Sequence, residues 1–201
     1  MKELNKYKRL KPKIIGFALQ NKHKEGLEFL LKNFKPPFPD EVKLDIAFFY
    51  YHLEYFQKAI KLYKEVIKNN QNCVTAIQFL GRVYSLTGKK EGIDLAKTAY
   101  ILQPDFMMTN NLANVYKFLN QNKLAEIWYK KTLKLCRGWE SRLVIKNNMA
   151  LFYKKTNRKK LANKYASEVL KSRLINQNKY RTLINSLKKD FPELKEKKGA
   201  R

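Results

Sequence analysis

The stretch "NNLANVYKFLNQNKLAEIWYKKTL", residues 110–133, decides the fold. Its apolar residues recur three or four positions apart, as they do on the buried face of a helix. The polar triplet "NQN" interrupts this rhythm with residues that favour a turn. Ala113 and Ala125, on either side of the turn, would let two helices approach closely, while Tyr116 and Tyr129 would fill the space around them. The stretch therefore predicts a pair of helices joined by a short turn.

The same pattern occurs four times along the chain. Each copy has an apolar residue followed by Ala or Gly, a Tyr three residues later, and a second small residue eight or nine positions after that Tyr. The second small residues, which are spaced 33, 33 and 37 positions apart, are Ala59, Gly92, Ala125 and Ala162. A period of this length indicates a tandem array of helical hairpins, each of which buries its apolar face against its neighbours.

These features resemble the tetratricopeptide repeat, whose pattern of apolar-Gly, Tyr, Ala, aromatic and Pro runs over about 34 residues. In the segment 73–105, Gly81, Tyr84, Ala99 and Pro104 stand at the positions of the family. The family's tryptophan early in the first helix is missing from every repeat. The resemblance implies an all-α fold, a right-handed superhelical solenoid of antiparallel helix pairs with a C-terminal capping helix.

We expect one continuous domain that begins and ends with segments outside the four repeats. The open end of a solenoid requires a polar cap, and "NKYRTLINSLKKDF" has the apolar spacing of such a helix. The expected parts are a basic N-terminal segment with a degenerate helical hairpin at 1–39, four repeats at 40–72, 73–105, 106–138 and 143–176, and the capping helix with a basic tail at 177–201.

In the family, the first helix of each hairpin lines a concave groove that typically binds a peptide or helix of a partner. The resemblance implies that this helix exposes three residues to the groove, which stand three positions before, one after and four after the first small residue of the repeat. Asn111 would lie at the edge of the groove. The exposed residues include Phe48, Tyr51, Gln78, Arg82, Asn110, Asn114, Lys117, Asn147 and Lys154. Amides there could hydrogen-bond a partner's backbone, and lysines would favour acidic side chains or a terminal carboxylate. Alternatively, asparagines fall there by chance, because the chain has 18 of them.

Some members of the family bind chaperones through a two-carboxylate clamp, which uses lysine and asparagine on one repeat, asparagine on the next and basic residues on the third. Asn114 and Asn148 match the two asparagines, and Arg181 could supply a base. However, Asn110 stands where the clamp requires lysine, so the resemblance to a clamp is incomplete.

The formal net charge of +26 suggests an anionic partner, and residues 104–201 carry most of it, with 24 basic and 7 acidic residues. A candidate patch for RNA, ribosome or another polyanion comprises Lys146, Lys155, Arg158, Lys159, Lys160 and Lys164. The competing interpretation is a solvated helix face in a lysine-rich chain, since 35 of the 43 basic residues are Lys. The scarcity of arginine, which binds phosphate better, favours protein binding over polyanion binding.

The sequence contains no motif for catalysis, a metal or a cofactor. Cys73 and Cys136 lack ligand spacing, and His23 and His52 are isolated in the sequence. A signal peptide or membrane span is not indicated either, which suggests a cytoplasmic protein. We therefore expect a non-catalytic scaffold or adaptor that needs no cofactor and binds a protein or peptide partner, for which the lysines favour acidic character. The alternative is an electrostatic binder of RNA or ribosome, and the oligomeric state is left open.

Overall fold

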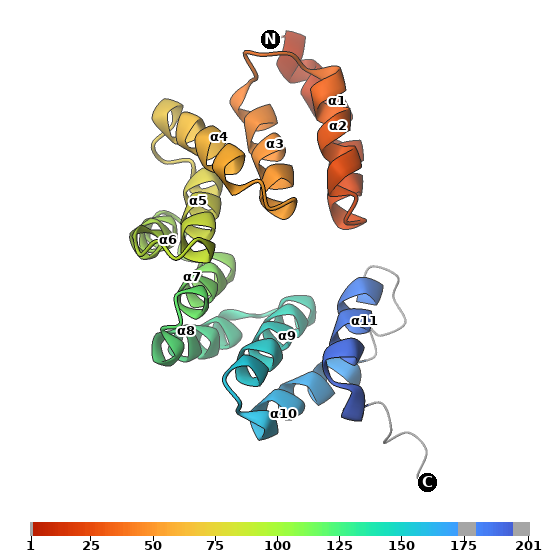
Figure 1. Cartoon of the computed structure of the whole chain (residues 1–201), viewed down its shortest axis with the longest axis vertical. Coiled ribbons are helices and arrows are strands. Elements are labelled where there is room, and N and C mark those ends of the chain that lie inside the picture. The colour runs from red at the N-terminus through yellow and green to blue at the C-terminus, as the bar shows by residue number, and fades with distance from the viewer. Residues whose placement is uncertain (1, 173–179, 195–201) are drawn as a thin grey trace. The chain divides into compact units, whose positions relative to one another are not determined.

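The computed structural model describes residues 2–172 and 180–194, which form α-helices, one short 3-10 helix and no strand. This confirms the all-α fold expected from the repeats (Figure 1). The helices are α1 (Lys2–Leu19), α2 (His23–Asn33), α3 (Asp40–His52), α4 (Phe56–Asn69), α5 (Val74–Leu86), α6 (Glu91–Leu102), α7 (Phe106–Phe118), α8 (Asn122–Leu135), α9 (Trp139–Lys155), α10 (Lys159–Leu170), α11 (Arg181–Asp190) and the 3-10 helix η3 (Pro192–Leu194).

Consecutive helices pack as pairs, and the chain consists of two compact units. Unit 1, Met1–Pro104, contains the pairs α1/α2, α3/α4 and α5/α6. Unit 2, Asp105–Arg201, contains the pairs α7/α8 and α9/α10, followed by α11 and η3. The basic tail expected after the last helix lies outside the described residues.

Small residues allow the two helices of a pair to approach backbone to backbone. A Cβ added to Gly92 on α6 would lie 2.6 Å from the carbonyl oxygen of Gly81 on α5 and 3.0 Å from the amide nitrogen of Ser85. The α5/α6 contact therefore requires glycine at position 92. In the α3/α4 pair, Ala47 and Ala59 are both fully buried. The small residues that recur in the sequence therefore stand where the two helices of a pair contact each other.

The turns inside the pairs use a residue with positive φ. Four of the five are residue types that tolerate this conformation, namely Asn21 (φ 56°), Gly88 (φ 78°), Asn120 (φ 58°) and Asn157 (φ 56°). Glu54 (φ 62°) occupies the same position between α3 and α4. Part of the asparagine content therefore serves the turns, and Glu54 is the residue least suited to its position.

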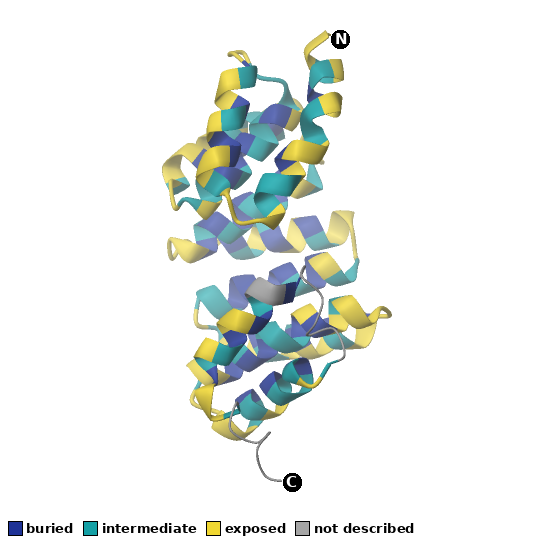
Figure 2. Cartoon of the chain, turned by 90° about the vertical axis from the view of Figure 1, so that its right-hand side faces the viewer, coloured by how far each residue is buried: buried dark blue, intermediate teal, exposed yellow. Residues whose placement is uncertain are grey.

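Each unit has its own core, as the burial colours of Figure 2 show. In unit 1, Ile46, Phe49 and Leu30 join α2 to α3, and Tyr63 and Val83 belong to a second cluster that includes α4 and α5. The buried residues of unit 2 include Leu112, Tyr129, Ile145, Phe152, Tyr153, Ile184 and Leu187. The last two belong to α11, which packs on α10 and caps the unit through its apolar face.

Replacing Glu54 by Gly should raise the free energy of unfolding by up to about 1 kcal/mol, because glycine adopts positive φ without the steric cost that a side chain incurs. The reverse change at an equivalent turn, Gly88→Glu, should lower it by a similar amount. Urea unfolding followed by circular dichroism measures both. A decrease for Glu54→Gly would mean that the Glu54 side chain makes a stabilising interaction that outweighs its backbone strain.

Candidate partner-binding surfaces

Asn114 lies in the interior of unit 2, not in an exposed groove as the sequence suggested. Its side chain is 3% exposed, and its Oδ1 accepts a hydrogen bond of 2.6 Å from the Tyr129 hydroxyl. A buried tyrosine hydroxyl requires a partner, and the amide on the facing helix supplies it. Asn114 therefore joins α7 to α8 and is not available to a ligand, which also removes one of the two asparagines of a clamp.

The other polar groove candidates of unit 2 also contact their own chain. Asn148 Nδ2 donates a hydrogen bond of 3.1 Å to Asn110 Oδ1 and so joins α9 to α7. Lys154 Nζ donates to the Asp190 carbonyl oxygen at 2.6 Å and lies 3.0 Å from its carboxylate, which ties α9 to α11. Lys117 lies over the ring of Phe118, at 4.7 Å from its centroid, and Asn147 is half-buried. The side chain of Arg181 is outside the described part of the chain.

Asn111 is the most unusual of the asparagines. It was expected at the edge of the groove, but it is only 1% exposed, and neither its Oδ1 nor its Nδ2 has a hydrogen-bond partner. An unpaired buried amide costs free energy, so Asn111 destabilises the fold unless a water or ligand satisfies it. The sequence offered no sign of this burial, because whether a polar residue on a helix faces the interior depends on the neighbouring hairpin.

In unit 1 the groove candidates form an aromatic surface, which we define as Phe48, Tyr51 and His52 of α3 with Phe79 and Arg82 of α5. Phe48 and Tyr51 each lie 5.7 Å from Phe79 between ring centroids, at interplanar angles of 90° and 65°. Such edge-to-face contacts fix the rings relative to one another. All three rings are half-buried, so part of each is accessible.

The two histidines that are isolated in the sequence are stacked in the structure. The ring of His23, at the start of α2, lies 4.3 Å from that of His52 at an angle of 14°. Burial against the neighbouring rings lowers the pKa of His52 to about 4, and the positive charges of His23 and Arg82 act in the same direction. Burial also lowers the pKa of His23, although the Glu25 carboxylate opposes this effect. Near pH 7 both rings are neutral.

Arg82 is the cation of the aromatic surface. Its guanidinium carbon lies 5.9 Å from the ring centroid of Tyr51 and 6.0 Å from that of Phe79. Its Nε is buried without a hydrogen-bond partner, and among the described residues no carboxylate forms an ion pair with it. Gln78, which precedes it by one turn on α5, is half-buried. The surface thus presents an uncompensated guanidinium on accessible rings.

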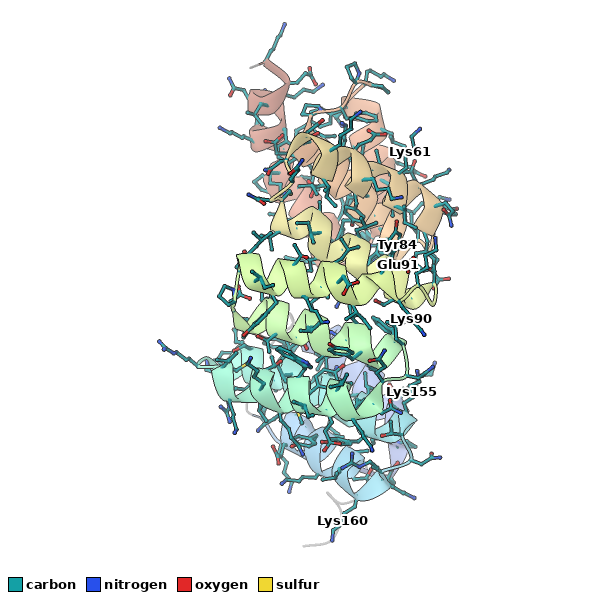
Figure 3. The ribbon with its side chains drawn as sticks, turned by 90° about the vertical axis from the view of Figure 1, so that its left-hand side faces the viewer. Lys61, Tyr84, Lys90, Glu91, Lys155 and Lys160 are labelled. Atoms are coloured by element: carbon teal, nitrogen blue, oxygen red, sulfur yellow. The ribbon has the colours of Figure 1, made fainter. Side chains whose placement is uncertain are left out.

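The candidate polyanion patch of unit 2 is partly neutralised by acidic residues. Arg158 donates to both carboxylate oxygens of Glu126, which also accepts a hydrogen bond of 3.1 Å from Tyr153 and lies 2.8 Å from Lys130. Lys146 forms an ion pair of 2.7 Å with Glu168. The central arginine of the patch therefore has a structural role. The four exposed lysines of the patch are Lys155, Lys159, Lys160 and Lys164, and Figure 3 shows Lys155 and Lys160 at the surface of unit 2.

Comparisons with known proteins agree with this architecture. Residues 109–138 match the family described as tetratricopeptide repeat. The fold is similar to that of TTC0263, a thermophilic tetratricopeptide-repeat protein of Thermus thermophilus, with a TM-score of 0.73 and 16% identity over 92% of this chain and 98% of that chain. It is also similar to MamA of Desulfovibrio magneticus RS-1, with a TM-score of 0.58 and 15% identity over 86% and 98%. No curated protein sequence matches the chain.

Among the helices of the described residues, none is long and apolar enough to cross a membrane. In the same part of the chain, His, Cys, Asp and Glu residues do not gather in groups of three or more that could hold a metal ion.

Replacing Asn111 by Leu should raise the free energy of unfolding by about 1–3 kcal/mol, because it removes an unpaired buried amide. The matched variant Asn114→Leu should lower it by about the same amount, since the Tyr129 hydroxyl loses its acceptor. Thermal unfolding of both variants tests whether the two changes in stability have opposite signs. Destabilisation by Asn111→Leu would contradict this account of Asn111.

Replacing Glu126 by Gln should lower the free energy of unfolding by roughly 1 kcal/mol near pH 7, because the hydrogen bonds from Arg158 would lose their charged acceptor. Those bonds hold the pKa of Glu126 at about 2, below its usual value of 4.5. The contribution is therefore complete above pH 4.5 and is lost as the pH falls towards 2. Urea unfolding at neutral and acidic pH should show that the difference between the two proteins shrinks on acidification.

Proposed function

We propose that this chain, a tetratricopeptide-repeat protein, is a non-catalytic scaffold that holds a segment of a partner protein on the aromatic surface of unit 1. One observation carries the proposal: the Arg82 guanidinium lies on the rings of Tyr51 and Phe79 without a carboxylate partner among the described residues. A cation that is partly removed from water, with a buried donor unpaired, gains more from an acidic ligand than a fully solvated lysine does.

The composition of the surface supports binding of a peptide or helix. Tyrosine and arginine are the residue types that most often dominate the energetics of protein interfaces. The rings of Phe48, Tyr51 and Phe79 are held by contacts with one another, so little side-chain entropy is lost when a ligand covers them. Gln78 adds an amide that can bond to a peptide backbone.

The ligand that fits best has an aromatic or aliphatic side chain next to a carboxylate. The apolar side chain would cover the accessible ring surfaces, and the carboxylate would accept paired hydrogen bonds from Arg82. Because His23 and His52 are neutral near pH 7, the charge of the site at that pH comes from Arg82.

Unit 2 by itself is the weaker candidate for binding a partner segment. It offers Asn147, which is half-buried, as a contact for a separate ligand. By contrast, Asn110, Asn148 and Lys154 would first have to give up their present partners. Breaking those hydrogen bonds would cost part of the free energy that a ligand could supply.

The test begins with affinity purification of the chain from its native cell and identification of the captured proteins by mass spectrometry. Arg82→Gln and Tyr51→Ala should each weaken binding of a captured partner at least about tenfold, because each removes a central contact. Lys97→Gln, an exposed change on α6, is the control that removes a charge elsewhere in unit 1. Unchanged affinity for Arg82→Gln, with an unchanged circular dichroism spectrum, would refute the assignment.

A further inference from the structure

Unit 1 also contains a pocket that shares no residue with the aromatic surface. It is a pocket of about 380 Å³ between α4 and the α2–α3 connection. Its apolar lining includes Leu31, which is 38% exposed, together with Phe38 and Leu62, both half-buried. Large aliphatic side chains are costly to leave exposed, so an apolar ligand group that covers them gains free energy.

Three lysines and one glutamate line the same pocket, and only one of the lysines has acidic partners among the described residues. Lys43 Nζ lies 3.2 Å from Asp40 and 3.4 Å from Glu65. Lys58 and Lys61, both exposed on α4, have no carboxylate partner in the part of the chain that the structure describes. Figure 3 shows Lys61 at the surface of unit 1.

The position of Lys58 is fixed by aromatic rings. Its Nζ lies 5.3 Å from the ring centroid of Tyr50 and 5.2 Å from that of Tyr55. Cation–π contacts of this kind hold the ammonium group near the pocket without neutralising its charge. Lys61 follows three residues later and so lies on the same side of α4. Two positive charges therefore stand beside an accessible apolar pocket.

We propose that this lysine-rimmed pocket, formed by Leu31, Phe38, Leu62, Lys58 and Lys61, binds an acidic segment of a partner protein. One apolar side chain of the segment enters the pocket, and the carboxylates on either side of it contact Lys58 and Lys61. The volume of the pocket is near the lower end of the range of about 300–1,000 Å³ for small-molecule sites, so it suits one large side chain with its immediate neighbours.

Charge complementarity decides among the possible occupants. A second copy of the chain carries a net charge of +26 and would be repelled by the uncompensated lysines. The C-terminal sequence "KEKKGAR" is also basic, which disfavours its binding at this pocket. An acidic partner is attracted by the same lysines that repel a second copy of the chain and the C-terminal sequence. Unit 1 would then have two separate docking surfaces, which suits a scaffold.

The probe is a short fluorescent peptide in which leucine is flanked by glutamates, and binding to the full chain is measured by anisotropy. The charge-reversal pair Lys58→Glu with Lys61→Glu should weaken binding at least about tenfold. The matched pair Lys68→Glu with Lys97→Glu changes the net charge equally, uses exposed residues outside the pocket, and should change affinity less than about twofold. Circular dichroism verifies that both pairs fold.

Three further measurements make the result specific. Replacing the leucine of the peptide by serine should abolish binding, because the apolar contact is lost. The same measurements are repeated in the Arg82→Gln background, in which the aromatic surface has lost its cation, and the weakening caused by the Lys58/Lys61 pair should persist there. Equal weakening by the two charge-reversal pairs, undiminished binding of the serine peptide, or disappearance of the Lys58/Lys61 effect in the Arg82→Gln background would each overturn the proposal. Carbodiimide coupling of the bound peptide should label Lys58 and Lys61 in preference to Lys68 and Lys97.

Discussion

The close approach of the two helices within each pair is the constraint on which the rest of the structure depends. At Gly81 and Gly92 the backbones are so near that a single added Cβ would collide with a carbonyl oxygen. Ala47 and Ala59 allow a similar contact in the preceding pair. Once two helices are this close, their apolar stripes cannot be covered within the pair, so each pair must pack on a neighbour. The tandem repeat is therefore required, because an isolated pair would leave its apolar stripes exposed to water.

Polar side chains in unit 2 are used mainly to hold helices together. Asn114 bonds to Tyr129, Asn148 bonds to Asn110, and Lys154 bonds to Asp190. Unit 1 differs, because α3 carries the rings of Phe48 and Tyr51 at the corresponding positions, and these rings pack on Phe79 of α5. Arg82 is left there with a charge that nothing in the described chain neutralises. The difference in side-chain chemistry makes unit 1 the better candidate for recognition.

The sequence predicted correctly the features that depend on residues close together in the chain. Small residues and tyrosines at a fixed period predicted the helix pairs, since packing of consecutive helices uses residues close together in the chain. Whether a polar residue on a helix faces solvent depends on the neighbouring hairpin, so Asn114 was wrongly expected to be exposed. The stacking of His23 on His52 had no sequence signal, because they belong to different hairpins and lack ligand spacing.

The sequence by itself determined the all-α class, the hairpin period and the residues where helices touch, because these are set by short-range sterics and by apolar periodicity. Only the tertiary structure decided which charges and amides are free. Arg158 is held by Glu126 from another hairpin, whereas Arg82 and Lys61 form no ion pair in the described chain. Such pairing depends on which side chains the packed hairpins bring within hydrogen-bonding distance, and the composition of the chain does not encode it.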